Sequence, residues 1–485
     1  MPDKFLIGWA ETDTTPDGRI ISLYGQYYQR IATGIHSRLK GTVLVLQKGD
    51  QQAVMVSLDL VNIGHTQELL RPMVHAAIPE IREESIFCNC IHTHSGPSAF
   101  KTVKRINDGW ETPPEGTMTG DEYLEFLLPR LLEAVKTAWT GRAPGGVARA
   151  FGNARIGHCR RPVFADATSE MYGDTTRPDF IGMEAGEDSG VEMLFTFDPE
   201  KKPTGMILNI ACPSQVMEAT YVVSSDYMGA SRELLKGEFG PDFHTLCQIS
   251  AAGCQSPRDL TRAYKTEPDF WHADGVPVLA NRVLKAVKEA FPQTEGKIDF
   301  DPVFRHDCAT CTLPLRRVSY QQYIASKKEL ARLLAIQGEQ EAFDDFARVT
   351  HEREKIPGRP GPYDDKLMHF VLIKNEQAVI ERYESQNEHP TYSYPMQTLR
   401  IGEIAMVNCP WELYLLFGQI IKARTKARQT FIVQLSGGIG AGYLPSPAAE
   451  RYAGYGGMII NGTVGSDGGF MLADIAVERL NAYFD

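Results

Sequence analysis

Two histidines, His92 and His94, are the residues of this chain best suited to chemistry, and they are separated by the single residue Thr93. On an extended backbone, residues two apart point to the same side, so the two imidazoles can converge on one metal ion or one reacting group. The pair directly follows a strand-like run at residues 85–90, and ligands of α/β proteins commonly bind at such strand ends. A turn that carries two surface histidines would have the same spacing, so both interpretations remain open.

Two other segments could supply groups to the same site. A zinc ion needs three or four ligands, and Glu412 follows an apolar run and opens a helical one, which would hold a carboxylate at a strand end. Acidic residues are also favoured in the first turn of any helix, so this position has a simple structural explanation. Ser256 lies in a turn of small residues after another strand, where its hydroxyl could face a site, although an ordinary Ser-Pro turn explains it equally well.

The run His92-Thr93-His94-Ser95-Gly96-Pro97 resembles the signature of the neutral (non-lysosomal) ceramidase family, zinc-dependent amidases that release a fatty acid from sphingosine. Further segments are similar to motifs of that family in the same order along the chain: Tyr24-Gly25, residues 34–39, Ser224-Ser225-Asp226, residues 253–258, Pro410-Trp411-Glu412 and residues 442–445. The resemblance covers nearly all of this chain and the catalytic part of the family. It implies an α/β fold in which helices flank a mixed β-sheet core.

The resemblance also implies a role for each matched residue. It implies a zinc ion bound by His92, Cys212, Glu412 and Tyr443. It implies catalytic roles for His94, Ser256, Tyr455 and Arg160, with His94 moving protons and the others stabilising the oxyanion. Cys212 stands where the family has a histidine, and Cys254 where it has an aspartate. Thiolate is a good zinc ligand, so the set remains chemically sensible, but a metal that binds sulfur is a weaker Lewis acid.

The function that the resemblance implies is a metal-dependent hydrolase that cleaves an amide bond of a small molecule with metal-activated water. Three other functions are compatible with the same residues. The chain could be a lactonase or esterase acting on a soluble small molecule, a hydrolase with a nucleophilic cysteine at position 212 or 254, or a metabolite-binding protein without metal or turnover. No basic amphipathic helix suited to a membrane surface is evident in the sequence, so we expect the substrate to be a soluble molecule and not ceramide itself.

Apolar runs of strand length alternate along the chain with amphipathic helical stretches, which predicts an α/β protein. Helices are expected at residues 67–77, 121–139, 228–236, 277–290 and 413–424. Strands are expected at residues 42–47, 53–58, 85–90, 192–197, 204–211, 245–250, 399–408 and 431–435. The candidate site residues lie at or just beyond the ends of several of these strands.

A single large domain, residues 1–485, is the simplest organisation, because no low-complexity linker and no 20–50-residue repeat divides the sequence. Residues 318–365 are an excursion from this domain. Their charged, helically periodic sequence predicts two surface helices joined at Gln337-Gly338, and residues 355–365 read as a connector rich in Pro and Gly. The sequence after the last helical run is too short for the C-terminal β-sandwich domain of the larger family members, so none is expected.

Composition narrows the class of protein further. The 485 residues include 61 acidic and 50 basic ones, giving a formal net charge of -11, which disfavours a nucleic-acid partner. No stretch approaches the ~18 apolar residues of a membrane span, and the N-terminal sequence lacks a signal-peptide core. Nine scattered cysteines suit a reducing compartment. We therefore expect a cytoplasmic protein with a small-molecule substrate and no stable membrane insertion.

Overall fold

The apolar runs at residues 42–47 and 53–58 form the hairpin that their spacing predicts. In the computed structural model, which describes residues 4–26, 29–101, 113–261, 273–353, 368–439 and 441–485, these runs are strands β4 (Lys40–Lys48) and β5 (Gln51–Leu58). The chain reverses at Gly49, whose φ of 59° is readily adopted by glycine. Strand β6 (Ile86–Cys90) then pairs with β5 in parallel, and the crossover contains helix α1 (Thr66–Ala77).

This arrangement of hairpin, helix and parallel strand occurs three times in the described residues, and each time a strand antiparallel to the hairpin precedes it and a second helix follows it. The first unit contains β1 (Leu6–Asp13), β4, β5, α1, β6 and α2 (Gly120–Thr140). The second contains β9 (Gly146–Asn153), β13 (Gly190–Phe197), β14 (Pro203–Ile210), α3 (Asp226–Phe239), β15 (His244–Ile249) and α4 (Gly275–Ala290). The third contains β17 (Phe304–Pro314), β18 (Thr391–Ile401), β19 (Ile404–Asn408), α8 (Leu415–Arg424), β21 (Gln429–Val433) and α10 (Ser466–Asn481).

Each unit forms one mixed sheet, and the strand orders correspond. They are β6-β5-β4-β1, β15-β14-β13-β9 and β21-β19-β18-β17, with β8 (Ala143–Pro144) added beside β1 in the first sheet. In every sheet the first pair is parallel and the others are antiparallel. The expectation of a mixed-sheet α/β fold is therefore confirmed.

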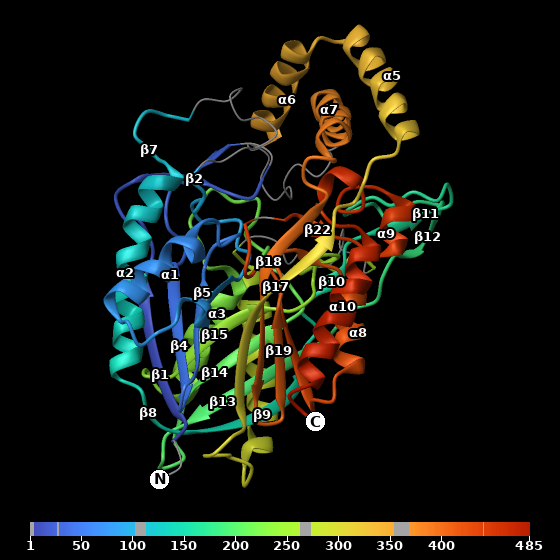
Figure 1. Ribbon diagram of the computed structural model, residues 1–485. Coiled ribbons are helices and arrows are strands. Elements are labelled where there is room, and N and C mark those ends of the chain that lie inside the picture. The colour runs from blue at the N-terminus through green and yellow to red at the C-terminus, as the bar shows by residue number, and fades with distance from the viewer. Residues whose placement is uncertain (1–3, 27–28, 102–112, 262–272, 354–367, 440) are drawn as a thin grey trace.

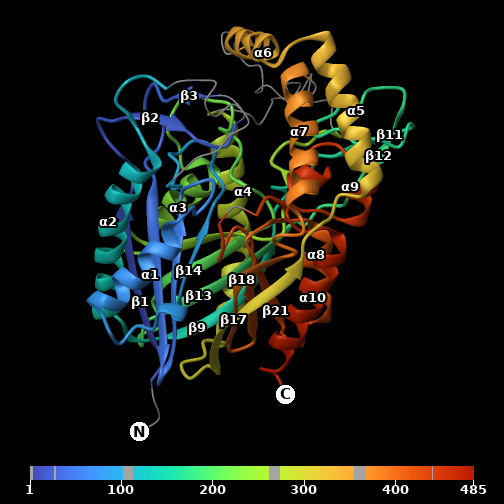
Figure 2. The same cartoon turned by 45° about the horizontal axis from the view of Figure 1, so that its top comes forward.

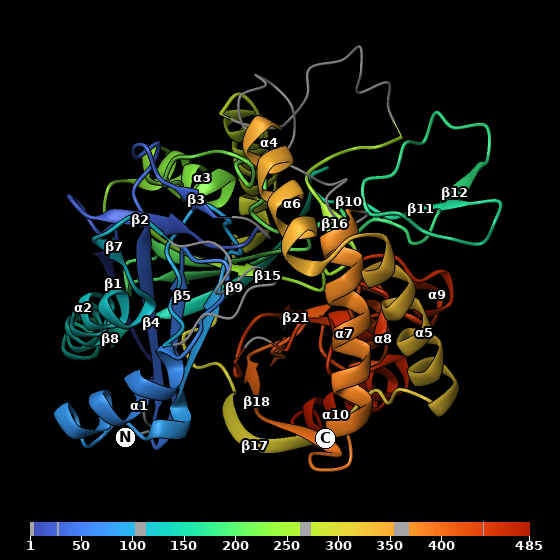
Figure 3. The same cartoon turned by 90° about the horizontal axis from the view of Figure 1, so that it is seen from above.

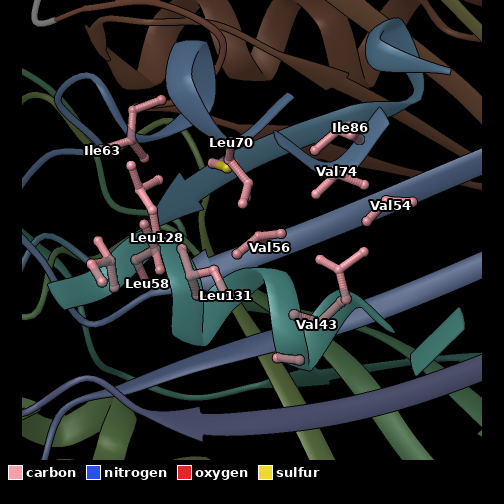
Figure 4. Packing of buried hydrophobic residues seen from close by; sticks show 14 of the residues in the cluster. Val43, Val54, Val56, Leu58, Ile63, Leu70, Val74, Ile86, Leu128 and Leu131 are labelled. Atoms are coloured by element: carbon pink, nitrogen blue, oxygen red, sulfur yellow. The ribbon is translucent and has the colours of Figure 1, made fainter. Parts of the chain in front are cut away.

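Helices cover one face of each sheet, and the opposite faces share one core. Side chains of α1 and α2 pack on β4 and β5, as Figure 4 shows for Val56, Leu70 and Leu131. Helices α3 and α4 pack in the same way on the second sheet, and α8 and α10 on the third. The inner faces of the three sheets, blue, green and orange to red in Figure 3, contribute to a common apolar cluster. Equivalent strands thus surround one centre, and the loops that follow them can meet.

Short elements complete the described structure. The strands are β2 (Ile20–Leu23), β3 (Arg30–Ile31), β7 (Thr117–Met118), β10 (His158–Cys159), β11 (Pro162–Phe164), β12 (Phe180–Met183), β16 (Gln255–Ser256), β20 (Glu412–Leu413) and β22 (Tyr443–Leu444). The helices are η1 (Glu83–Ser85), η2 (Phe291–Thr294), α9 (Pro447–Tyr452) and η4 (Ile459–Asn461). None of the described helices combines the length and the apolar character needed to cross a membrane.

The segment predicted as an excursion contains helices α5 (Tyr320–Ile336) and α6 (Glu339–Arg353), which meet at Gln337-Gly338 as expected. Residues 355–365, expected to be a connector, lie outside the described residues. Helix α7 (His369–Ser385), which the sequence analysis missed, packs with α5 and α6 around a separate apolar cluster. Figures 1 and 2 show these three helices together at the end of the molecule opposite both termini.

One predicted strand is wrong. Residues 399–408 were expected to be continuous, but they belong to two antiparallel strands, β18 and β19, because the chain reverses at Gly402 with a φ of 58°. Apolar residues occur on both sides of the turn, so a single glycine is the visible signal. The correction matters for the site, because the reversal makes β19 the strand that leads to Glu412.

Candidate functional site

The residues singled out in the sequence lie mainly in loops that follow the two parallel-paired strands of each sheet. His92 and His94 follow β6, Cys212 follows β14, and Glu412 follows β19. The loop after β6 is held on two sides, because Thr93 Oγ1 donates to the carbonyl of Ser224 at 2.7 Å and Ser95 Oγ donates to that of Met217 at 2.9 Å. The ends of the three sheets therefore build one buried polar cluster.

A hydrogen bond to the backbone fixes which ring nitrogen of His92 carries the proton. Its Nδ1 lies 2.6 Å from the carbonyl oxygen of Val61, which can only accept, so Nδ1 carries the proton and Nε2 a lone pair. Nε2 faces Oε2 of Glu412 at 3.5 Å. Burial lowers the pKa of His92 even though Glu412 opposes this shift, which favours the neutral imidazole. The backbone φ of His92 is 61°, an unusual conformation that turns the ring into the cluster.

His94 lies beside His92 and is contacted at both ring nitrogens. Its Nε2 is 3.2 Å from Nε2 of His92 and 2.9 Å from Nε2 of Gln215, and its Nδ1 is 3.8 Å from Oε2 of Glu218. Burial, followed by the charges of His92 and Arg30, lowers the pKa of His94 well below its usual value. Gly25, from the Tyr24-Gly25 motif, packs against this ring so closely that a Cβ there would lie 2.7 Å from it.

Arg160 is the cation of the cluster and is almost completely buried. Its Nη1 donates to Oε1 of Gln215 at 3.1 Å, and its Nη2 donates to the hydroxyl of Tyr443 at 3.1 Å and lies 3.5 Å from Oε2 of Glu412. Nη2 also donates to the carbonyl of Gly253 at 3.0 Å. Although burial opposes it, the surrounding phenols and the Glu412 carboxylate raise the pKa of Arg160, so its charge is permanent.

Glu412 and Tyr443 are placed side by side by the short parallel pair β20 and β22. Burial and the nearby Glu412 carboxylate raise the pKa of Tyr443 well above its usual value, so in this environment the phenol is protonated. Gly253 approaches this pair so closely that a Cβ there would lie 2.3 Å from the carbonyl of Glu412. The sequence therefore needs a glycine where the turn before Ser256 meets the loop after β19.

Ser256 and Tyr455 lie at the edge of the same cluster. Ser256 is fully buried, its Oγ accepts the backbone N–H of Arg258 at 3.1 Å, and its hydroxyl shares a hydrogen bond with Tyr172, which also bonds Arg160. The ring of Tyr455 packs edge to face against that of Tyr443 at 5.6 Å. The structure thus brings His92, His94, Arg160, Ser256, Glu412, Tyr443 and Tyr455 into one neighbourhood.

Cys212 faces a different environment. Its thiol is completely buried and contacts the carbonyl oxygens of Ile156 at 3.6 Å and Pro213 at 3.5 Å. Burial raises the pKa of this thiol well above its usual value, as it does for Cys254. Cys254 accepts a hydrogen bond from the side chain of Gln255 at 3.3 Å. Both cysteines are thus in surroundings that favour the thiol over the thiolate.

A divalent cation fits part of the predicted ligand set. The lone pair on Nε2 of His92 faces the Glu412 carboxylate, and these two electron-rich atoms are spaced like neighbouring ligands of one ion. Within the described ranges, no three His, Cys, Asp or Glu side chains are arranged to hold an ion, so the phenol of Tyr443 is needed as the third protein ligand. Cys212, with its thiol directed at backbone carbonyls, does not fit this set as it stands.

Sequence analysis missed Gln215, Glu218 and Tyr172. A signal for Gln215 is present in the chain: the loop after β14 reads Cys212-Pro213-Ser214-Gln215, and the loop after the equivalent strand β19 reads Cys409-Pro410-Trp411-Glu412. Both loops begin with Cys-Pro and place an amide or a carboxyl group three residues after the cysteine. Comparing the two loops pairs Gln215 with Glu412, which the sequence analysis had already named as a candidate metal ligand.

The α/β fold of this chain is like that of neutral ceramidases. Two solved structures resemble this chain, a neutral ceramidase from Pseudomonas aeruginosa and a ceramidase complexed with C2. Each comparison gives a TM-score of 0.67 at 16% sequence identity and covers 99% of this chain and 75% of the other. By sequence alone, no family model and no curated protein matches the chain.

Proposed function

We propose that this protein is a metal-dependent hydrolase that cleaves an amide bond of a small N-acyl substrate. The observation that carries the proposal is the convergence of the Arg160 guanidinium with a paired His92 and Glu412 and with the phenol of Tyr443, residues that together come from all three units of the fold. Acyl transfer needs donors for a developing oxyanion and a group that can move a proton, and this cluster contains both. The likeness to solved ceramidases supports the same class of reaction.

His92, Glu412 and Tyr443 would hold the metal. A bound divalent cation would polarise the substrate carbonyl and make water a better nucleophile at neutral pH. The hydrogen bond from Nδ1 of His92 to Val61 keeps Nε2 available as a ligand, which is the second-shell arrangement typical of metal-binding histidines. Tyr443 would lose its proton when the metal binds, because the positive charge would lower the phenol pKa that burial and Glu412 now raise.

The remaining groups carry out orientation and proton transfer. Arg160 donates hydrogen bonds to the developing oxyanion. Tyr172 bonds Arg160 directly and Ser256 bonds Tyr172, so both help to hold the guanidinium in place. Tyr455 packs against Tyr443 and closes that side of the site. His94 takes the proton that the attacking water loses and passes it to the leaving nitrogen, because its imidazole lies at the centre of the cluster, beside His92 and Gln215.

Hydrolysis of a matched substrate panel tests this proposal. The panel consists of a short-chain N-acylsphingosine, an N-acyl amino acid, an acyl p-nitroanilide and the corresponding p-nitrophenyl ester, each incubated with the full chain before and after chelator dialysis. We expect at least one amide to be hydrolysed, activity to be lost on dialysis, and Zn²⁺ to restore it. Hydrolysis of the ester alone would contradict the amide assignment, and full activity in verified metal-free protein would contradict the metal.

A further inference from the structure

Arg161 is a second buried arginine next to the site, directly after Arg160 in the chain. The two residues link β10 to β11, and successive side chains of an extended segment point to opposite sides. Arg160 therefore reaches into the cluster, and Arg161 reaches away from it. The Nε of Arg161 donates to Oε2 of Glu184 at 2.5 Å, and both of these side chains are at most 1% exposed. Since burying two charges is costly, the pair depends on further hydrogen bonds.

The other donors of Arg161 hold the loop that carries Tyr455. Its Nη2 donates to the carbonyl of Ala453 at 2.6 Å, and its Nη1 donates to the carbonyl of Tyr455 itself. A guanidinium is planar and presents its donors in a fixed fork, so these two bonds fix where both carbonyls lie. The backbone of Tyr455 is thus held by Arg161, while its ring packs against Tyr443, a proposed metal ligand, at 5.6 Å.

This loop depends on bonds from outside it, because its own backbone is strained. Ala453 has a φ of 51°, a conformation that residues other than glycine rarely adopt. Gly454 follows with a φ of 70° and lies so close to the carbonyl of Ser169 that a Cβ there would be 1.9 Å from it. Residues 453–458 lie between α9 and η4 and belong to neither helix. Arg161 supplies two of the bonds that keep this conformation in place.

Glu184 connects Arg161 to the hairpin of β11 and β12. Arg161 immediately precedes β11, Glu184 immediately follows β12, and the backbone N–H of Glu184 donates to the carbonyl of Arg161 at 2.9 Å. The ion pair therefore closes the base of this hairpin, which Figure 3 shows at the outer edge of the molecule. The Oε1 of Glu184 also accepts from Oγ of Ser446 at 3.4 Å, at the N-cap of the helix α9 that leads into the loop.

We propose that Arg161, oriented by Glu184, is a positioning residue that sets the ring of Tyr455 against Tyr443. This inference rests on the proposed hydrolysis, in which Tyr455 closes one side of the site. In the described residues, the side-chain hydrogen bonds of Arg161 go to Glu184, Ala453 and Tyr455, so Arg161 acts through the loop and not on the substrate. Without this support the ring of Tyr455 moves, while Arg160 and the proposed metal ligands keep their own contacts.

Fluorine NMR of the full chain labelled with 3-fluorotyrosine tests this inference without any need for turnover. The Tyr455 resonance is assigned by its absence from Tyr455→Phe. Arg161→Lys keeps a positive charge beside Glu184 but replaces the fork with one ammonium, so we expect the Tyr455 resonance to shift or broaden. Arg232→Lys is the matched control, because Arg232 is similarly buried and its ion pair with Asp59 lies outside the Tyr455 loop. We expect this control to leave the resonance unchanged.

A second variant covers the case in which Arg161→Lys does not fold. Glu184→Gln keeps the guanidinium and removes only its charged partner, so we expect a smaller change of the Tyr455 resonance. An unchanged Tyr455 resonance in whichever variant folds would overturn the inference.

A double-mutant cycle on kcat connects the ring to the reaction. We expect Arg161→Lys and Tyr455→Phe each to lower kcat about 10–100-fold, with a smaller change in KM. We expect the double variant to lose no more than the larger of the two single effects, because both changes remove the same interaction. A loss in the double variant equal to the product of the single losses would show that Arg161 does not act through Tyr455.

Failure of the broader function gives a different pattern. If the Tyr455 resonance moves in Arg161→Lys alone while the wild type hydrolyses no amide, the positioning of Tyr455 by Arg161 stands and the amidase proposal fails. If amides are hydrolysed but the resonance does not move, the amidase proposal stands and the role of Arg161 fails.

Discussion

The loops that follow β14 and β19 begin alike and serve different purposes. Both start with Cys-Pro, in both the cysteine thiol faces backbone carbonyls, and in both the residue three positions later contacts Arg160. That residue is the neutral Gln215 in one loop and the acidic Glu412 in the other. The two Cys-Pro loops thus place a side chain at equivalent positions beside Arg160. The loop after β14 presents the carboxamide of Gln215 there, and the loop after β19 presents the carboxylate of Glu412, a proposed metal ligand.

The same comparison gives Cys212 a second explanation, as a structural residue of its loop. Cys409 occupies the equivalent position, and its thiol contacts the carbonyl of Trp411 at 3.9 Å, much as Cys212 contacts that of Pro213. Burial raises the pKa of Cys212 well above its usual range and that of Cys409 to about 12. In both loops the cysteine thiol contacts a backbone carbonyl of its own turn, which favours a structural role for Cys212.

The largest effect is expected from removing the charge that distinguishes the two loops. Glu412→Gln makes the β19 loop resemble the β14 loop, and we predict loss of bound metal and a fall in amide hydrolysis of about 10³-fold or more. The matched control is Glu403→Gln, on the β18–β19 turn outside the cluster. Metal analysis and kcat measured on both variants check this prediction, and wild-type metal content in Glu412→Gln would refute it.

The reverse exchange should have a smaller effect. Gln215→Glu gives the β14 loop a carboxylate of the same size, which strengthens its contact with Arg160 but places an acceptor against the lone pair on His94. We predict a fall in kcat of about 10–100-fold with metal content retained, because one well-placed group is altered and the proposed ligands are untouched. A kcat equal to that of the wild type would show that the amide nitrogen of Gln215 has no part in organising His94.

The anchoring of the β14 loop should make stability depend on pH. Asp226 Oδ2 accepts the backbone N–H of Met217 at 2.7 Å, and burial raises the pKa of this carboxyl to about 6 from a usual value of 3.8. The folded state therefore binds a proton at this carboxyl more tightly than the unfolded state, so the contribution of Asp226 to stability is complete below pH 4 and is lost as pH rises through 6. The loss attributable to this group is about 3 kcal/mol. Urea titrations from pH 4 to 7 should show this slope in the wild type and lose it in Asp226→Asn.

The smallest effects are expected at the two cysteines. Cys212→Ser and Cys409→Ser each keep a donor that can reach the same carbonyls, so we predict a loss of about 1 kcal/mol in the free energy of unfolding and no change in metal content. Parallel denaturation and metal analysis of the two variants make a matched pair. Loss of metal in Cys212→Ser but not in Cys409→Ser would restore Cys212 to the ligand set.

The sequence predicted the fold well where local patterns were strong. The α/β class, the β4–β5 hairpin and the joint between α5 and α6 follow from apolar periodicity and glycine-containing turns. The three-unit arrangement did not follow, because the units share topology and packing and show no regular sequence period. The strand at residues 399–408 was wrong because apolar residues flank the turn at Gly402 on both sides.

Site prediction was limited by a different problem. His92 and Glu412 were candidates from their residue types and their places after strands, and the family resemblance added Tyr443 and the metal-binding role of all three. Glu218 could not be nominated, because a carboxylate in a loop has no distinctive spacing, and Gln215 could be found only by comparing the two Cys-Pro loops; both residues contact His94 across the fold. Cys212 was nominated because it stands where the resembled family has a histidine, and its thiol contacts the carbonyls of Ile156 and Pro213.

Titration of the full-length, metal-free protein with Co²⁺, followed by its electronic absorption spectrum, tests the central claim most directly. We predict one ion per chain, bound through His92, Glu412 and Tyr443, with a spectrum that lacks thiolate-to-cobalt charge transfer and is unchanged in Cys212→Ser. Failure to bind any ion, or a thiolate band that disappears in Cys212→Ser, would contradict the account.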